Sequence, residues 1–139
     1  MKYLFDSSAV FRAIKENKVD FLTGNYTLEL ARYELGNIIW KDYFLLTKIS
    51  KEESKKIVKA VKHTLTIMEV LQIDGSEEEI LETATQLKIS FYDASYVYLA
   101  KAKELRLITE DLRLIKKVAA IINVSMLNEI EHQNGKKQS

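Results

Sequence analysis

Apolar and polar positions along the chain divide it into short apolar runs of strand length and longer stretches with helical spacing. Residues 2–6 (Lys-Tyr-Leu-Phe-Asp) predict a short buried strand that ends on a carboxylate. Residues 106–109 (Arg-Leu-Ile-Thr) predict a second strand, which also runs into acidic residues. A further strand is predicted near residues 121–125, and residues 70–73 predict either a short strand or the end of a helix.

Between these runs, apolar residues recur every three or four positions, as on a helix with one buried face. Residues that can cap a helix precede most of these stretches, and Ser50 with Glu53 has the form of a capping box. The predicted caps and helices are, in chain order, Ser7 or Ser8 with a helix to about residue 16, Thr27 with about 28–46, Ser50 with a helix to about 68, Ser76 with a helix to about 87, Ser90 with about 91–104, and a helix at about 112–120.

This alternation of short strands with helices predicts an α/β fold, in which helices flank a central, mostly parallel sheet. The chain has no internal repeat and no linker, so we expect one domain over residues 1–130 and a polar, frayed tail over 131–139. Ligands of such sheets bind outside the carboxyl ends of the strands, where Asp6 and Asp111 are placed.

The composition limits which kinds of catalytic and metal-binding site the chain can form. The 139 residues include no cysteine and two histidines, which excludes disulfide scaffolds and thiol nucleophiles and argues against a histidine-rich metal site. The net charge of +1 means that a nucleic-acid partner would have to be held by local basic patches. The longest uncharged run, residues 118–128, is too short to span a bilayer, and no secretory signal is visible. We therefore expect a cytoplasmic protein with no membrane partner.

Basic and aromatic clusters each have two readings. Two basic clusters are either solvated helix faces or contacts to phosphates: Lys51, Lys55, Lys56, Lys59 and Lys62; and Arg106, Arg113, Lys116 and Lys117. Two aromatic clusters are either packed in the core or available to bases or partners: Tyr92, Tyr96 and Tyr98; and Trp40, Tyr43 and Phe44.

Four carboxylates stand where a surface acid is not expected. Asp6 and Asp111 end apolar strands, although each can also act as a helix cap. Asp93 heads an apolar helical stripe, or is a first-turn acid favoured by the helix dipole. Glu34 shares a helix face with apolar residues and needs a partner, which an ion pair with Arg32 or a lysine would also supply.

If these four carboxylates converged at about 6 Å, their repulsion would sum to roughly 15 kcal/mol at an effective dielectric constant near 20. Such a cluster is tolerated mainly when a divalent cation lies within it. Oxygen-only ligands favour Mg²⁺ or Mn²⁺, and an incomplete carboxylate cage suits hydrolysis of a phosphodiester.

With these acids in place, the chain resembles the PIN-domain ribonucleases, in particular the VapC-type toxins of toxin–antitoxin pairs. The resemblance covers residues 2 to about 127 and lies in four motifs: Leu4-Phe-Asp6-Ser-Ser8, Tyr33-Glu34-Leu-Gly-Asn37, Tyr92-Asp93-Ala94, and Leu107-Ile-Thr109-Glu-Asp111. The last motif matches the family pattern Thr-x-Asp, with Glu110 as an additional acid and an alternative ligand.

The resemblance implies a PIN-like three-layer fold and a Mg²⁺- or Mn²⁺-dependent endoribonuclease with a small antitoxin partner. Asp6, Glu34, Asp93 and Asp111 would hold the metal. The residues expected to orient those carboxylates, or water and phosphate, are Ser7, Asn37 and Thr109. We also expect a homodimer. The alternatives are a PIN module that binds RNA or protein without cutting, and a nuclease directed at DNA.

Overall fold

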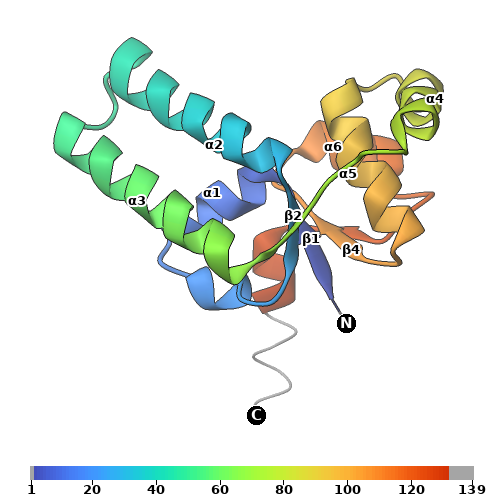
Figure 1. Cartoon of the computed structure of the whole chain (residues 1–139), viewed down its shortest axis with the longest axis horizontal. Coiled ribbons are helices and arrows are strands. Elements are labelled where there is room, and N and C mark those ends of the chain that lie inside the picture. The colour runs from blue at the N-terminus through green and yellow to red at the C-terminus, as the bar shows by residue number, and fades with distance from the viewer. Residues whose placement is uncertain (1, 132–139) are drawn as a thin grey trace.

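A five-stranded parallel sheet forms the centre of the protein, which is described by a computed structural model over residues 2–131 (Figure 1). All four strand pairs are parallel, and the spatial order is β3-β2-β1-β4-β5. The strands are β1 (Tyr3–Phe5), β2 (Tyr26–Leu28), β3 (Glu69–Leu71), β4 (Arg106–Ile108) and β5 (Val124–Ser125). The predicted α/β fold with a parallel sheet is confirmed.

Helices cover both faces of this sheet and complete three layers (Figure 1). They are α1 (Ser7–Lys15), the 3-10 turn η1 (Val19–Phe21), α2 (Leu30–Trp40), the π-helical turn η2 (Lys41–Leu45), α3 (Lys51–Ile67), α4 (Glu77–Leu87), α5 (Phe91–Ala102) and α6 (Leu112–Val118). Residues 127–131 are also helical.

The alternation of side chains along β1 and β4 divides the core in two. Phe5 and Ile108 face a cluster built from α1, α2, α3 and the helical residues 127–131. Leu4 and Leu107 face the opposite cluster, which α5 and α6 supply. Successive residues of a strand point to opposite faces of the sheet. The consecutive pairs Leu4-Phe5 in β1 and Leu107-Ile108 in β4 therefore each contact both helical layers.

The strand order places β1 at a switch point. From β1 the chain builds β2 and β3 on one side, and then returns to place β4 and β5 on the other. Crevices at the carboxyl ends of parallel strands form where the direction of building reverses. Asp6 follows β1 and Thr109 follows β4, so both lie at this crevice.

The prediction that Thr27 caps a helix at residues 28–46 is wrong. Thr27 belongs to β2, and its buried hydroxyl donates a hydrogen bond to the Phe5 carbonyl oxygen at 2.8 Å. The helix begins at Leu30 instead and runs into η2, so the remainder of the predicted helix is present.

Other boundaries also differ. The cap of α1 is Asp6 and not Ser7 or Ser8, because the Asp6 carboxylate accepts a hydrogen bond from the Ala9 amide. Ser76 precedes α4 without a side-chain capping bond. The expected tail over 131–139 lies outside the described residues except for Glu131. No helix within residues 2–131 combines the length and apolar character needed to cross a membrane.

Helices α2 and α3 form an antiparallel arm that extends away from the sheet (Figure 1). Near its tip, Trp40 and Phe44 stack with their ring centroids 5.8 Å apart, and both are largely exposed. Leu45 and Leu46 are exposed beside them in the sequence, whereas Tyr43 packs partly against the core. We call the exposed residues Trp40, Phe44, Leu45 and Leu46 the arm-tip patch.

Candidate active site

Asp6 is the most deeply buried of the four predicted acids, with 6% of its surface exposed. Its Oδ1 atom accepts hydrogen bonds from the Ser8 hydroxyl at 2.6 Å and from the Ala9 amide at 3.0 Å. The Thr109 hydroxyl also favours the ionised form. Burial outweighs these contacts and, together with the charge of Asp93, raises the pKa of Asp6 from 3.8 to about 6.

Glu34 projects from α2 toward α5 and is half-buried. Its Oε1 atom accepts a hydrogen bond from the Tyr96 hydroxyl at 2.8 Å, and the Ser7 hydroxyl also bonds to it. Desolvation raises the pKa of Glu34, and the charge of Asp93 adds to this effect. The alternative ion pair with Arg32 is absent, because Arg32 binds Glu29 at 2.7 Å.

Asp93 lies in the first turn of α5, which Ser90 caps. Partial burial raises the pKa of Asp93, as does the charge of Asp111, while Lys117 acts in the opposite direction. The charge of Asp93 also acts on Asp6 and Glu34. Asp93 therefore couples electrostatically to the three other predicted acids.

Asp111 is exposed and caps α6, since its Oδ1 atom accepts hydrogen bonds from the Arg113 and Leu114 amides at 3.0 and 3.2 Å. It shares an open depression of about 230 Å³ with Asp93. Three basic residues also line this depression: Lys88, Arg113 and Lys117. Two acids are thus bordered here by three cations.

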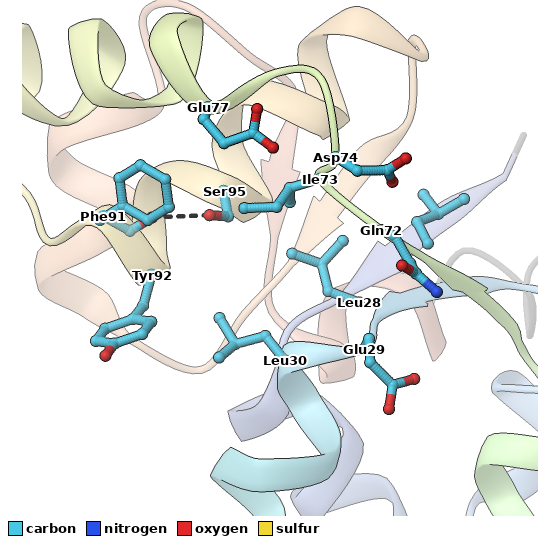
Figure 2. A pocket seen from close by; sticks show the side chains of 11 residues that line it. Leu28, Glu29, Leu30, Gln72, Ile73, Asp74, Glu77, Phe91, Tyr92 and Ser95 are labelled. Atoms are coloured by element: carbon cyan, nitrogen blue, oxygen red, sulfur yellow. Dashed lines mark hydrogen bonds between the residues drawn. The ribbon is translucent and has the colours of Figure 1, made fainter.

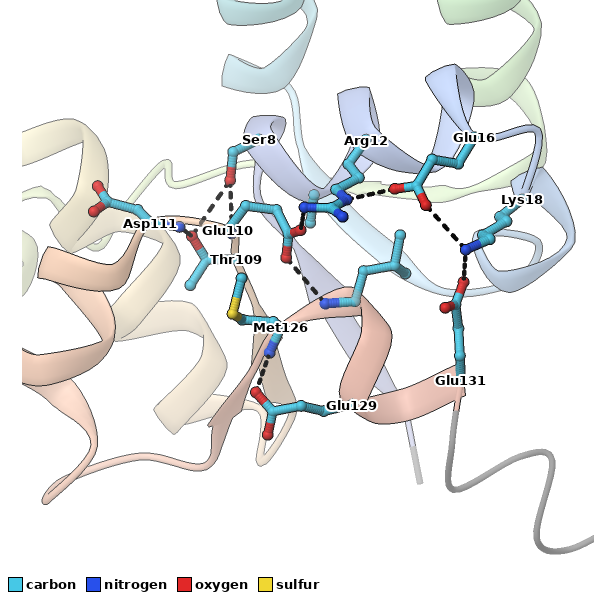
Figure 3. A network of polar contacts seen from close by, with 12 residues as sticks. Ser8, Arg12, Glu16, Lys18, Thr109, Glu110, Asp111, Met126, Glu129 and Glu131 are labelled. Atoms are coloured by element: carbon cyan, nitrogen blue, oxygen red, sulfur yellow. Dashed lines mark hydrogen bonds and ion pairs between the residues drawn. The ribbon is translucent and has the colours of Figure 1, made fainter.

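The side chain of Glu110, the additional acid, points away from Asp111 (Figure 3). Its Oε1 atom pairs with Arg12 of α1 at 2.9 Å, and its Oε2 atom accepts a hydrogen bond from the Leu127 amide at 3.0 Å. The Glu110 amide donates to the Ser8 hydroxyl at 3.0 Å. Glu110 therefore links β4, α1 and the helical residues 127–131.

The structure thus brings Asp6, Glu34 and Asp93 into one electrostatic group, with Asp111 joined to it through Asp93. Within residues 2–131, no three His, Asp or Glu side chains are spaced to hold a single metal ion as they stand. The donors are nevertheless all oxygens, and the pKa of each of the three grouped acids is raised by burial and by repulsion. Charge and donor type therefore fit a hard divalent cation.

Several contacts at this site were not predicted from the sequence. Tyr96 is packed in the core, as one of its two predicted readings expects, and in addition its hydroxyl holds Glu34. Its position three residues after Asp93, on the same face of one helix, was an available signal. The contacts of Ser8 with Thr109 and Glu110 had no such signal, because they join segments about 100 residues apart. Asn37 is exposed, and among the described residues no hydrogen bond joins it to a carboxylate.

Comparison with known proteins gives consistent matches. The model of the PIN domain matches residues 3–121. The chain is 30% identical over 129 residues to Exonuclease VapC9 of Pyrobaculum aerophilum, covering 91% of this chain and 93% of that protein.

Solved structures share the fold. The crystal structure of PAE2754 from Pyrobaculum aerophilum has a TM-score of 0.76 and 24% identity, covering 94% of this chain and 92% of that one. A toxin–antitoxin complex from Klebsiella pneumoniae has a TM-score of 0.62 and 18% identity, covering 89% of this chain and 96% of that one.

Proposed function

Because the chain belongs to the PIN-domain family, we propose that it is a metal-dependent endoribonuclease and the toxin of a toxin–antitoxin pair. The observation that carries this proposal is the group formed by Asp6, Glu34 and Asp93 at the switch point of the sheet. Each of these carboxylates has a raised pKa, and within residues 2–131 no basic side chain acts to lower the pKa of Asp6 or Glu34. Uncompensated negative charge in a crevice is what a bound cation would stabilise.

Asp6, Glu34, Asp93 and Asp111 would hold Mg²⁺ or Mn²⁺. A bound metal of this kind lowers the pKa of a water molecule and shields charge on a phosphate. The protein's own contribution is to keep the carboxylates ionised and oriented. The hydroxyls of Ser7 and Tyr96 do this for Glu34.

Asp6 is held in the same way from two strand ends. Ser8, at the start of α1, and Thr109, after β4, both place a hydroxyl on its carboxylate. The Thr109 contact, together with that of Ser7 on Glu34, supports the proposal that Ser7 and Thr109 orient the ligands. Asn37 remains a proposed contributor that would act on water or phosphate from the exposed face of α2.

The depression beside Asp93 and Asp111 is suited to the phosphate backbone of the substrate. Lys88, Arg113 and Lys117 border it, and the Lys117 Nζ atom is held by a hydrogen bond to the Lys88 carbonyl oxygen at 2.8 Å. Basic side chains at such a position attract phosphates and fix the register of the strand without reading its sequence.

A circular RNA tests the proposal, because it has no ends and only an endonuclease can open it. We expect cleavage with Mg²⁺ or Mn²⁺, none with EDTA, and none by Asp6→Asn with either metal. Asp20→Asn, a surface acid outside the site, is the matched control and should cut normally. Cleavage of linear RNA alone would indicate an exonuclease, and binding without cleavage would indicate a non-cleaving module. A single-stranded DNA of the same sequence is the second substrate arm.

The arm-tip patch supports a protein partner. Exposed apolar clusters of this kind mark interaction sites, and one of the solved structures that share this fold is a toxin–antitoxin complex. We propose that an apolar segment of a small antitoxin covers Trp40 and Phe44. A short reading frame next to the gene would supply the candidate, and Phe44→Ser should weaken its complex with this chain.

A homodimer of the free chain is the second proposed assembly. Light scattering of the chain alone should give twice the monomer mass. A monomeric mass at high protein concentration would contradict this proposal while leaving the antitoxin proposal open to its own test.

A further inference from the structure

We propose that a second depression, next to the acid group, binds a nucleobase of the RNA and prefers bases that carry an exocyclic amino group. This inference rests on the proposed function. The depression has a volume of about 330 Å³ and lies where β2 and β3 end and α4 and α5 begin (Figure 2). That volume is at the small end of the range typical of ligand sites.

The lining offers a flat apolar ligand a surface to pack on. Leu28, Leu30 and Ile73 form the centre of the depression, and Phe91 and Tyr92 stand on one side of it (Figure 2). Tyr92 is 60% exposed, although its neighbours in α5 are largely buried. Exposed aromatic rings of this kind stack on single-stranded bases, because every base has a π-face.

The polar rim selects the chemistry of the ligand. Three acids line the depression: Glu29, Asp74 and Glu77. Among the residues that the structure describes, no lysine, arginine or histidine lines it. Such a rim repels a phosphate and accepts hydrogen bonds from donors. Adenine, cytosine and guanine present amino groups, whereas uracil presents two carbonyl oxygens and one N–H.

Two of the rim groups are free to accept such bonds. Glu29 is occupied by Arg32, and Glu77 accepts from the Gly75 amide at 2.9 Å. No described residue hydrogen-bonds the side chains of Asp74 or Gln72, which lie opposite Phe91 and Tyr92 (Figure 2). Asp74 and Gln72 are therefore the two unpaired acceptors that the rim offers to the amino group of a bound base.

The depression also adjoins the acid group, because both draw residues from α2 and α5. Tyr92 directly precedes Asp93, and Leu30 lies one helical turn before Glu34, which corresponds to about 5–6 Å between Cβ atoms. Ser95, another lining residue, adjoins Tyr96, whose hydroxyl holds Glu34. A base in this depression would thus be close to the bond that is cut, because the neighbouring Asp93 lines the basic depression proposed for the phosphates.

Nucleosides test the inference without involving cleavage, since they carry no phosphate. The full-length protein, isotopically labelled, is titrated in EDTA with adenosine, cytidine and uridine while amide resonances are followed. We expect adenosine and cytidine to shift resonances of residues 71–77 and 91–95, with uridine at least about threefold weaker. Tyr92→Ala should weaken adenosine binding at least about fivefold, the equivalent of 1 kcal/mol of stacking.

Two further variants make the test specific. Val58→Ala removes an exposed apolar side chain of α3, outside both depressions, and should leave nucleoside binding unchanged. Asp74→Asn replaces an acceptor with an amide that can also donate, and should reduce the preference against uridine.

Shifts that are absent up to the solubility limit, or unchanged in Tyr92→Ala, would overturn the inference, and so would equal binding of uridine. Cleavage of circular RNA is scored separately. If the RNA is cut but no nucleoside binds, the proposed function stands and the base site falls. If nucleosides bind but no RNA is cut, the base site stands and the nuclease proposal falls.

Discussion

Replacing Asp6 with asparagine should stabilise the metal-free protein at alkaline pH. The folded state holds this carboxyl in a buried position that raises its pKa from 3.8 to about 6. At 1.36 kcal/mol per pKa unit, ionised Asp6 lowers the free energy of unfolding by about 3 kcal/mol above pH 6. This cost disappears as the pH falls from 6 toward 4, because the folded state takes up a proton before the unfolded state does.

Asparagine removes the charge while keeping the shape and the capping oxygen. Its side-chain carbonyl can still accept from the Ala9 amide, and asparagine and aspartate are similarly good N-caps. The bond from Ser8 at 2.6 Å is weakened, since it no longer ends on a charged acceptor. We therefore expect a net gain of about 1–3 kcal/mol at pH 8 and a difference near zero at pH 4.5.

Urea unfolding in EDTA at the two pH values measures this difference. Subtracting the wild-type value at each pH cancels the titrating groups that do not interact with Asp6, while the repulsion between Asp6 and Asp93 remains part of the measured difference. Asp20→Asn is the control for removing a surface acid, and should change the free energy of unfolding by less than about 0.5 kcal/mol at either pH. A variant that is destabilised at pH 8, or equally affected at both values, would refute the reasoning.

Three further predictions concern the proposed metal site. Asp111→Asn should slow RNA cleavage at least about 100-fold, which corresponds to about 3 kcal/mol of barrier. Glu110→Gln should slow cleavage less than about tenfold, because the Glu110 carboxylate is already paired with Arg12 and the Leu127 amide. Single-turnover rates with Mn²⁺ measure both, and the reverse order would show that Asp111 is not the fourth ligand. Glu34→Gln should abolish cleavage with little change in the melting temperature, since an amide oxygen can still accept the tyrosine bond; a stable variant that still cuts would reduce Glu34 to a structural residue. Mg²⁺ or Mn²⁺ should raise the melting temperature of the wild type but not of the Asp6→Asn/Asp93→Asn double variant, and an unchanged response in that variant would exclude a shared site.

The elements that the sequence predicts well are those with strong local signals. β1 and β4 are apolar runs that end on acids, and α3 begins at a capping box that the structure retains. β2 has no such signal, because its three residues run almost directly into the apolar pattern of α2. Thr27 looks like a helix cap in the sequence. Its hydroxyl is instead bound to Phe5, 22 residues earlier, a contact that only the folded sheet creates.

The residues of the site also divide into those with a local sequence signal and those placed by distant contacts. The four acids can be found because each stands at a strand end or on an apolar helix face. Their partners come from distant segments and cannot be found in that way. Arg12 in α1 takes up Glu110, and Tyr96 in α5 takes up Glu34. Local pattern therefore identifies the charged groups, whereas tertiary packing decides which of them face the crevice.

The pairing of β1 with β4 has a consequence for how the protein is made. Tyr3 lies opposite Arg106 in the sheet, so about 100 residues must be synthesised after β1 before β4, its second neighbour, can pair with it. Contacts of such long sequence separation are formed slowly, after the entropy of closing a large loop has been overcome. On a ribosome, the crevice between β1 and β4 is therefore assembled only after β4 has been made. A nascent chain or a truncated product that stops before β4 would contain Asp6 and Glu34 but no completed site, so the assembled centre exists only once β4 has been translated.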